Sequence, residues 1–328
     1  YSVNIRKGSV KKLTTKAGAH SGLLSDGGRY LLDIHSAVTT PYNVSLIDIN
    51  KNTSKTFYEA PNPNEKYDLG TVEFLTLKAD DGTPLYAKMV KPRDFDPNKK
   101  YPVLVYVYGG PHDQLVINQW NGATYPWMLA MAQNQQYIIF TMDNRGSENR
   151  GFAFESVIHR NLATYAMKDQ MVGVEYLKSL PYINTNRLAI YGWSFGGFLT
   201  SSLMYRSPGT FTTAVAGGAV IDWKYYEVMY GERYMDTPEE NPQGYEDTRV
   251  SNYIKNLKGN ILYIHGYIDA TVVPQNMLDI SQAAITEGKV IHTFLYPNQE
   301  HNVRGNESIH LTKTIVDFVL KNNVETNK

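Results

Sequence analysis

The sequence predicts an α/β protein with a mostly parallel, doubly wound sheet, preceded by a smaller β-rich part. From about residue 70 onward, short apolar strands alternate with helical patterns, whereas only short β-type runs separated by turn signals occur before it. A long strand–helix alternation indicates a parallel sheet covered by helices on both faces. We therefore expect a first domain at residues 1–68 and a second at residues 69–328.

The first domain is expected to be a remnant of a β-propeller. Its runs at 30–35 and 44–49 have β-type composition, and turn signals occupy 25–28 and 50–52. About four strands at this spacing correspond to one to one and a half propeller blades, too few to close a ring. Because repeated units bury their faces against neighbours, we expect this part to be exposed unless the following domain covers it.

The second domain has the strand and helix pattern of a doubly wound sheet. Strands are predicted at 72–77, 86–90, 103–108, 137–142, 188–191, 213–217, 261–265 and 291–296, and helices at 169–180, 274–287 and 311–320. In such sheets the functional site lies at the carboxyl ends of the strands.

The composition excludes several classes of function. Lys+Arg and Asp+Glu each count 32 in 328 residues, so no basic excess favours nucleic acid or acidic lipid. Cysteine is absent, which excludes thiol nucleophiles and thiolate metal sites, and we expect neither a metal nor a cofactor. No apolar run is long enough for a membrane helix. Tyr1 is not an initiator Met and no signal-peptide pattern follows, so we expect a processed or excised fragment.

The most specific local signal is the stretch GWSFG at 192–196, which follows an apolar strand and leads into a helix start. This is the context of a nucleophile elbow in α/β-hydrolases. Glycines let the strand and the helix crowd together, while Ser194 takes a strained conformation that exposes its hydroxyl. A glycine-rich turn that merely packs a helix on a sheet would give the same letters, but the strand and helix around it favour a catalytic Ser194.

A serine nucleophile needs a base, and the base needs an acceptor that fixes its tautomer. His265 and His292 fall within predicted strands, where a satisfied core histidine is expected. His310 opens the last helix and is expected at the surface. His301 lies in a polar loop directly after a strand, from which a base can reach over the sheet edge, so it is the predicted base.

The predicted acid is Asp269, in a short loop after the strand at 261–265 and thus at the same sheet edge as the elbow. Asp279 falls inside the next predicted helix. Asp222 follows an earlier strand, but it could equally cap a helix over 223–230. The order Ser, Asp, His along the chain is that of α/β-hydrolases.

Two donors are expected to stabilise an oxyanion. The first is the backbone N–H of Phe195, next to the nucleophile. The second should come from the loop after the first parallel strand, where the phenol of Tyr108 could donate in place of an amide. A tyrosine that only closes a strand over a glycine turn would look the same.

Ordered motifs give the region from Tyr101 to the C-terminus a specific resemblance. They are VYGGP at 107–111, DNRGS at 143–147, GWSFGG at 192–197, WKYY at 223–226, YGERYM at 230–235, HG at 265–266 with Asp269, and EH at 300–301. The chain resembles the catalytic domain of the prolyl oligopeptidase family of serine peptidases, most closely the dipeptidyl peptidase IV branch.

The resemblance implies a role for each candidate residue. Ser194 would be the nucleophile, Asp269 the orienting carboxylate, His301 the base, and Tyr108 with the Phe195 amide the oxyanion hole. The pocket for the residue before the scissile bond would be lined by Val220, Trp223, Tyr226, Tyr230 and Val272.

An aromatic slot suits a proline ring, which is apolar and lacks a backbone N–H. Trp223, Tyr226 and Tyr230 recur at helical spacing, which would place their rings on one helix face. Ordinary packing of a helix on a core would give the same spacing.

The chain departs from the family pattern in three places. Phe195 stands where the branch usually has Tyr, which keeps the backbone donor but changes the pocket wall. Ala270 and Thr271 follow the acid where mammalian members resemble Asp-Asn, which affects polar contacts to the substrate carbonyl. The family's paired glutamates, which hold the substrate's amino terminus, lie on a propeller that this chain almost wholly lacks, so that role has no residue here.

We therefore expect a serine exopeptidase that releases N-terminal dipeptides with Pro or Ala at the second position, through an acyl-enzyme on Ser194. The alternatives are an acylaminoacyl peptidase, a prolyl oligopeptidase or an esterase of the same fold, and a non-catalytic interaction protein, against which the intact Ser194, Asp269 and His301 argue. Peptides are the expected partners, and a homodimer through the helix at 311–320 is possible. The expected location is the periplasm, the cell envelope or outside the cell.

Overall fold

The computed structural model describes residues 1–67, 69–122 and 124–325 and divides into two compact units. The first unit is Tyr1–Leu69 with Val116–Pro126, and the second is Gly70–Leu115 with Trp127–Lys328. The expected division between residues 68 and 69 stays an expectation, because Asp68 lies outside the described residues. The segment 116–126, which the sequence assigned to the second domain, groups with the first unit.

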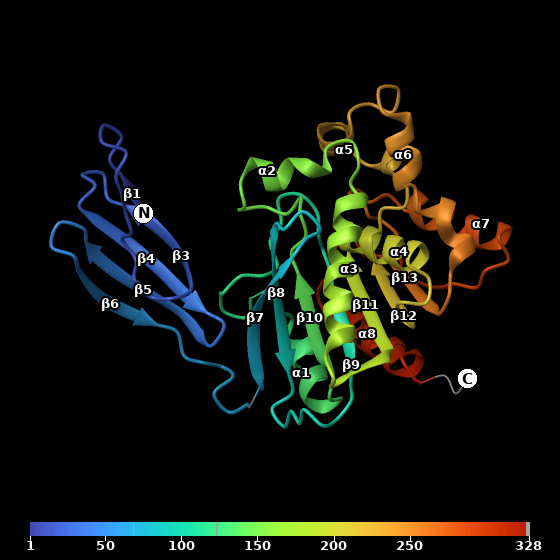
Figure 1. Ribbon diagram of the computed structural model, residues 1–328, viewed down its shortest axis with the longest axis horizontal. Helices are drawn as coiled ribbons and strands as arrows, with labels where there is room; N and C mark the ends of the chain where they lie inside the picture. The colour runs from blue at the N-terminus through green and yellow to red at the C-terminus, as the bar shows by residue number, and fades with distance from the viewer. Residues whose placement is uncertain (68, 123, 326–328) are drawn as a thin grey trace. The chain divides into compact units, whose positions relative to one another are not determined.

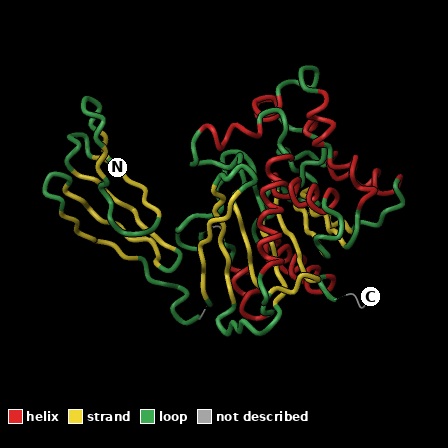
Figure 2. Tube along the Cα trace, viewed as in Figure 1, coloured by secondary structure: helices red, strands yellow, loops and turns green. Residues whose placement is uncertain are grey.

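The first unit contains an antiparallel sheet with the meander order of one propeller blade. Its strands are β3 (Ala19–Leu24), β4 (Tyr30–Ala37), β5 (Thr40–Asp48) and β6 (Thr53–Glu59), and β1 (Ser2–Val3) pairs separately with β2 (Val10–Lys11). Figure 2 shows strands and loops in the N-terminal part and no red helix. Leu23 of β3 and Phe57 of β6 are 69% and 60% exposed.

Hydrogen bonds explain why the segment Val116–Pro126 belongs to the blade. The side chain of Asn118 accepts a hydrogen bond from the Val38 amide at 3.1 Å, and the Trp120 amide donates to Ser36 Oγ at 3.2 Å. These bonds join residues some 80 positions apart in sequence, a pairing that local sequence patterns do not encode.

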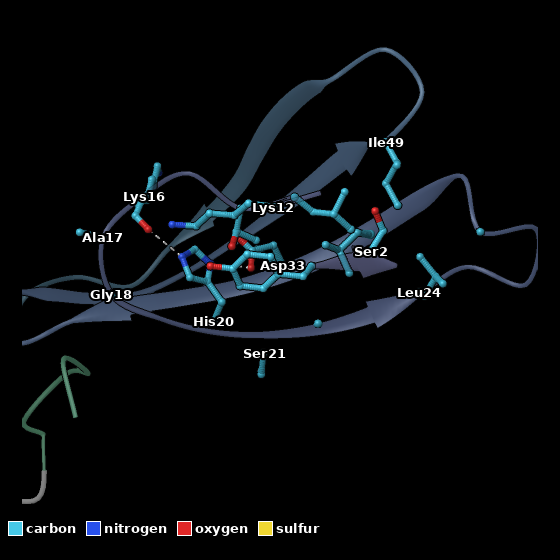
Figure 3. A pocket seen from close by; sticks show the side chains of 16 residues that line it. Ser2, Lys12, Lys16, Ala17, Gly18, His20, Ser21, Leu24, Asp33 and Ile49 are labelled. Carbon is cyan, nitrogen blue, oxygen red and sulfur yellow. Dashed lines mark hydrogen bonds and ion pairs between the residues drawn. The ribbon is translucent and has the colours of Figure 1, made fainter. Parts of the chain in front are cut away.

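The blade also holds the pocket of Figure 3, and none of the predicted site residues lines it. The His20 ring lies on its wall, with Nδ1 2.8 Å from Asp33 Oδ1 and Nε2 3.0 Å from the Lys16 carbonyl. These contacts fix the ring between two acceptors and help to join β3 to β4.

The second unit is built on an eight-stranded sheet of the α/β-hydrolase type. Its order is β14-β13-β12-β11-β9-β10-β8-β7. The strands β7 and β8 pair antiparallel, and the six from β9 to β14 run parallel. The bounds are β7 (Thr71–Lys78), β8 (Pro84–Lys91), β9 (Tyr101–Tyr106), β10 (Ile138–Met142), β11 (Ile183–Trp193), β12 (Thr213–Gly217), β13 (Asn260–Gly266) and β14 (His292–Tyr296). Each of the eight strands predicted from the sequence is present.

Helices cover both faces of this sheet (Figure 1). Because side chains alternate along a strand, Val103 and Val105 of β9 pack with one buried cluster and Leu104 with the other. The first cluster includes α3 (Thr164–Ser179), α4 (Phe195–Arg206) and α7 (Gln275–Thr286), and the second α1 (Pro126–Asn134) and α8 (Glu307–Asn322). Shorter helices lie in the connections: α2 (Phe152–Glu155), α5 (Val228–Met235), α6 (Pro242–Thr248), and the 3₁₀ turns η1 (Ser156–Ile158), η2 (Trp223–Tyr225) and η3 (Val250–Asn256).

No helix within residues 1–67, 69–122 and 124–325 has the length and apolarity needed to cross a membrane.

A buried arginine joins three parts of the second unit. Arg145, in the loop after β10, has a side chain that is 3% exposed, and its Nε and Nη2 donate to both carboxylate oxygens of the fully buried Asp169 on α3. Its Nη2 and Nη1 also donate to Asp80 and Asp81 in the β7–β8 turn, at 2.7 and 2.8 Å. These bonds hold the pKa of the Arg145 guanidinium above its ordinary value.

We expect Arg145→Met to lower the free energy of unfolding by about 3–5 kcal/mol, because it leaves the Asp169 carboxylate buried without its cation. Urea denaturation measures the change. Lys168→Met is the control, since Lys168 also pairs with Asp80 but is 53% exposed, and it should cost less than about 1 kcal/mol. Equal losses for the two variants would contradict the role given to Arg145.

Candidate active site

Ser194 occupies a sharp turn between β11 and α4. Its backbone has φ 61° and ψ −119°, a conformation that side-chain-bearing residues rarely adopt. The turn is so tight that a Cβ on Gly192 would lie 2.3 Å from the Gly196 carbonyl oxygen, and one on Gly196 would lie 2.3 Å from that of Val107. The nucleophile elbow expected from the sequence is therefore present, and its glycines are required by the backbone contacts.

His301 and Asp269 form a hydrogen-bonded pair. Nδ1 of His301 lies 2.7 Å from Oδ2 of Asp269. A carboxylate only accepts, so the proton in this bond is on Nδ1, and Nε2 is the atom that a general base would use. The Asp269 carboxylate is fully buried, and its Oδ1 accepts from the amides of Val272 and Thr271 at 2.8 and 2.9 Å.

These contacts keep Asp269 ionised. Burial by itself would raise the pKa of the carboxyl group, but the hydrogen bond from His301, followed by those from Val272 and Thr271, outweighs it, and the pKa lies below its ordinary value. An ionised Asp269 holds the imidazole in one tautomer and stabilises the imidazolium that forms when His301 takes a proton.

The segments that carry Ser194 and His301 both contact the end of β12 or the residues around it. The Ser194 amide donates to the Gly217 carbonyl at 2.8 Å, and Nε1 of the preceding Trp193 donates to the His301 carbonyl at 2.9 Å. A Cβ on Gly218 would lie 3.0 Å from Cε1 of His301. The absence of a side chain at Gly218 thus lets the His301 ring approach the elbow.

The other candidate acids are engaged elsewhere. Asp222 caps η2 by accepting from the Lys224 amide at 2.9 Å, as the alternative interpretation of the sequence expected. Its other oxygen lies 3.3 Å from Arg249 Nε, and Arg249 also pairs with Asp279 of α7 at 3.0 Å. Of the three aspartates weighed from the sequence, Asp269 is the one bonded to His301.

The remaining histidines divide between core and surface. The prediction of a satisfied core histidine is confirmed for His265, which is 3% exposed and lies 2.7 Å from the Val272 carbonyl through Nε2. The same prediction is wrong for His292, which is exposed. The reason is that β14 is an edge strand, and the His292 ring packs there against Phe318. His310 is exposed, as expected.

Tyr108 lies in the loop after β9 and not at the end of the strand, because β9 ends at Tyr106. A Cβ on the neighbouring Gly110 would lie 2.8 Å from the Phe195 ring, so this loop is pressed against the start of α4. The rings of Tyr108 and Phe195 are 6.2 Å apart. The Phe195 amide is in the first turn of α4, where amides have no intrahelical acceptor. Both expected oxyanion donors are thus on adjoining segments beside Ser194.

Two residues that the sequence did not single out, Asn144 and Gln170, hold the loop that carries Tyr108. Nδ2 of Asn144 donates to the Gly109 carbonyl at 3.0 Å. Gln170 of α3 donates in turn to Asn144 Oδ1 at 3.1 Å and to the Met142 carbonyl at 2.8 Å. The available signal was the place of Asn144, two residues after the end of β10 and so at the same sheet edge as the elbow.

The three aromatic residues predicted for the pocket form one cluster, although they do not share the predicted helix. The expected helix over 223–230 does not form: Trp223 is in η2, Tyr226 is extended, and Tyr230 is in α5. The break arises because Glu227 caps α5 by accepting from the Met229 amide. The Trp223 ring nevertheless lies 5.5 Å from Tyr226 and 6.0 Å from Tyr230, and those two are 5.1 Å apart.

The two predicted aliphatic pocket residues lie next to these aromatic rings. Val220 and Val272 are buried in the same cluster as Trp223 and Phe195, on the loops after β12 and β13. Burial raises the pKa of Tyr226 and of Tyr230, so both phenols stay neutral. The cluster is therefore apolar and carries no charge. In the described part of the chain, no three His, Asp or Glu side chains are grouped to hold a metal ion.

Comparisons with known proteins point to one family of peptidases. The sequence model described as "Prolyl oligopeptidase family" matches residues 123–325. Among curated relatives, human dipeptidyl peptidase 8 is 30% identical over 318 residues, covering 93% of this chain and 35% of the relative. The probable dipeptidyl-aminopeptidase B of Talaromyces marneffei is 32% identical over 323 residues, covering 92% of this chain and 34% of the relative.

Two solved structures are similar over nearly the whole chain. A putative dipeptidyl aminopeptidase IV from Bacteroides ovatus has a TM-score of 0.93 and 44% identity, covering 98% of this chain and 46% of that one. The Porphyromonas gingivalis dipeptidyl peptidase 4 has a TM-score of 0.90 and 30% identity, covering 96% and 45%. The chain thus spans about a third of the length of the curated relatives and under half of these structures.

The strained backbone at Ser194 predicts different stabilities for two variants that both remove the hydroxyl. Ser194→Gly should be more stable than Ser194→Ala by about 1 kcal/mol, because glycine adopts φ 61° without strain while alanine does not. Thermal and urea unfolding of the two variants measure the difference. A more stable alanine variant would show that the elbow stores no strain.

Proposed function

Because the chain belongs to the prolyl oligopeptidase family, we propose that the protein is a serine exopeptidase that releases N-terminal dipeptides with Pro or Ala at the second position. The observation that carries the proposal is the 2.7 Å hydrogen bond between His301 and a buried Asp269, beside a strained serine elbow. The names of the relatives, dipeptidyl peptidases and dipeptidyl aminopeptidases, support the same reaction.

In the proposed reaction, Ser194 Oγ attacks the carbonyl carbon of the second residue of the peptide. Nε2 of His301 takes the hydroxyl proton, and Asp269 stabilises the imidazolium. The C–N bond then breaks, and the proton passes from His301 to the leaving amine, which leaves the dipeptide as an ester on Ser194. Water, activated by His301, hydrolyses the ester and restores the serine.

The negative oxygen that forms in each step needs donors. We assign this role to the Phe195 amide and the Tyr108 phenol, which lie on adjoining segments beside the elbow. The pocket for the second residue is assigned to Val220, Trp223, Tyr226, Tyr230 and Val272. Its aromatic faces favour a proline ring, which brings no N–H that would need an acceptor.

A homodimer and an envelope location stay predictions. For a homodimer, α8 offers the exposed Ile309 at its start as a contact. Leu278 and Ile285 of α7, seven residues apart and so on one helix face, are exposed as well, but α7 packs with the other buried cluster. The location in the periplasm, the envelope or outside the cell is proposed on the family resemblance.

The intact protein should cleave a chromogenic Gly-Pro amide, and Ser194→Ala should abolish the cleavage. The free amine form should be preferred over its N-acetylated form, as a dipeptidyl peptidase requires. Steady-state kcat/KM for the two substrates measures the preference. A preference for the acetylated substrate would instead favour an acylaminoacyl peptidase or a prolyl oligopeptidase, and a protein that neither cleaves nor reacts with a fluorophosphonate probe would be a binding module.

Tyr108→Phe should lower kcat about 10²- to 10³-fold with little change in KM, because the lost hydroxyl acts on the oxyanion of the transition state and not on the ground state. Steady-state kinetics with the same amide measures both constants. Tyr176→Phe, which removes a hydroxyl from α3, is the control and should leave both unchanged. A rise in KM alone would assign Tyr108 to substrate binding.

A further inference from the structure

His265 is a buried histidine that the proposed mechanism does not use. It lies near the carboxyl end of β13, four residues before Asp269, and its side chain is 3% exposed. Nε2 lies 2.7 Å from the Val272 carbonyl oxygen and 3.6 Å from Oδ2 of Asp269. The shorter distance is a hydrogen bond and the longer one is not.

This geometry fixes the proton on His265. The Val272 carbonyl only accepts, so Nε2 must donate to it. Burial lowers the pKa of His265 below its ordinary value, which keeps the ring neutral with that single proton. A neutral His265 ring adds no positive charge beside Asp269, so it does not compete with His301 for the carboxylate.

The peptide groups around Val272 are therefore held at both ends. The Val272 amide donates to Asp269 Oδ1 at 2.8 Å, and the Val272 carbonyl accepts from His265 at 2.7 Å. The Val272 side chain is fully buried in the pocket cluster. One residue thus connects the acid of the proposed triad with the wall of the proposed pocket.

A second close contact places the end of β13 against the segment that precedes His301. A Cβ on Gly266, the residue after His265, would lie 2.1 Å from the carbonyl oxygen of Glu300, the residue before His301. Movement of the β13 end would therefore disturb the positions of both Asp269 and His301.

We propose that His265 is a positioning residue. By donating to the Val272 carbonyl, it fixes the positions of the Asp269 carboxylate and of the Val272 side chain in the proposed pocket relative to each other. The proposal rests on the proposed peptidase function of the same site. It predicts that one hydrogen bond, distant from the scissile bond, controls both the rate of acyl transfer and the selectivity between proline and alanine.

The test compares His265→Gln with His265→Met in the intact protein. The two side chains have nearly the same length, and glutamine keeps an N–H near the position of Nε2 while methionine has none. We expect His265→Met to lower kcat/KM for a Gly-Pro amide by about tenfold or more, to lower the Gly-Pro to Gly-Ala ratio, and to slow fluorophosphonate labelling of Ser194. His265→Gln should stay within about threefold of the wild type in all three measurements.

Unfolding experiments on both variants separate positioning from loss of the fold. If the methionine variant does not fold, His265→Asn replaces it, because its shorter amide cannot reach the Val272 carbonyl. Equal losses in the glutamine variant and in the variant without the donor would overturn the proposal, and so would an unchanged Gly-Pro to Gly-Ala ratio. A wild-type protein that cleaves neither amide would instead overturn the proposed function.

Discussion

The site depends on a backbone contact that leaves no room for side chains. Gly192 and Gly196 bring the end of β11, the start of α4 and the Val107 carbonyl to distances that a Cβ would make impossible. This contact fixes the direction of α4, and with it the strained backbone of Ser194 and the position of the Phe195 amide. It also places the loop after β9 beside the serine, so the nucleophile and both proposed oxyanion donors depend on the same crossing.

Around that crossing, buried polar groups hold the loops that follow the parallel strands. Arg145 joins the loop after β10 to α3, and Asn144 in the same loop holds the Gly109 carbonyl. The loop after β13 is held by Asp269 and His265 through the Val272 peptide. Each of these groups is buried or partly buried and is paired, which avoids the cost of an unpaired polar group in the core. Such paired bonds have defined directions, so they position loops more sharply than apolar packing does.

Chemistry and selectivity are distributed differently over the protein. The proposed nucleophile, base, acid and proline pocket all come from the second unit, on loops after β11, β12, β13 and β14 and on η2 and α5. Recognition of the substrate's amino terminus has no residue assigned to it in this chain, which spans about a third of its curated relatives. The proposed acyl transfer is thus a property of this unit, whereas the proposed dipeptide length would be set by groups outside it.

By itself the sequence determined the eight strands, the elbow at Ser194 and the placement of Asp269 and His301 on loops, because these follow from local apolar runs, breaks and glycines. Only the tertiary structure decided that His292 lies on an edge strand, that residues 116–126 join the blade, and that Trp223, Tyr226 and Tyr230 meet without a shared helix. The supporting hydrogen bonds of Asn144 and His265 also could not be predicted from the sequence. Such features depend on strand order and loop approach, which bring together residues far apart in the chain and leave no periodic signal along it.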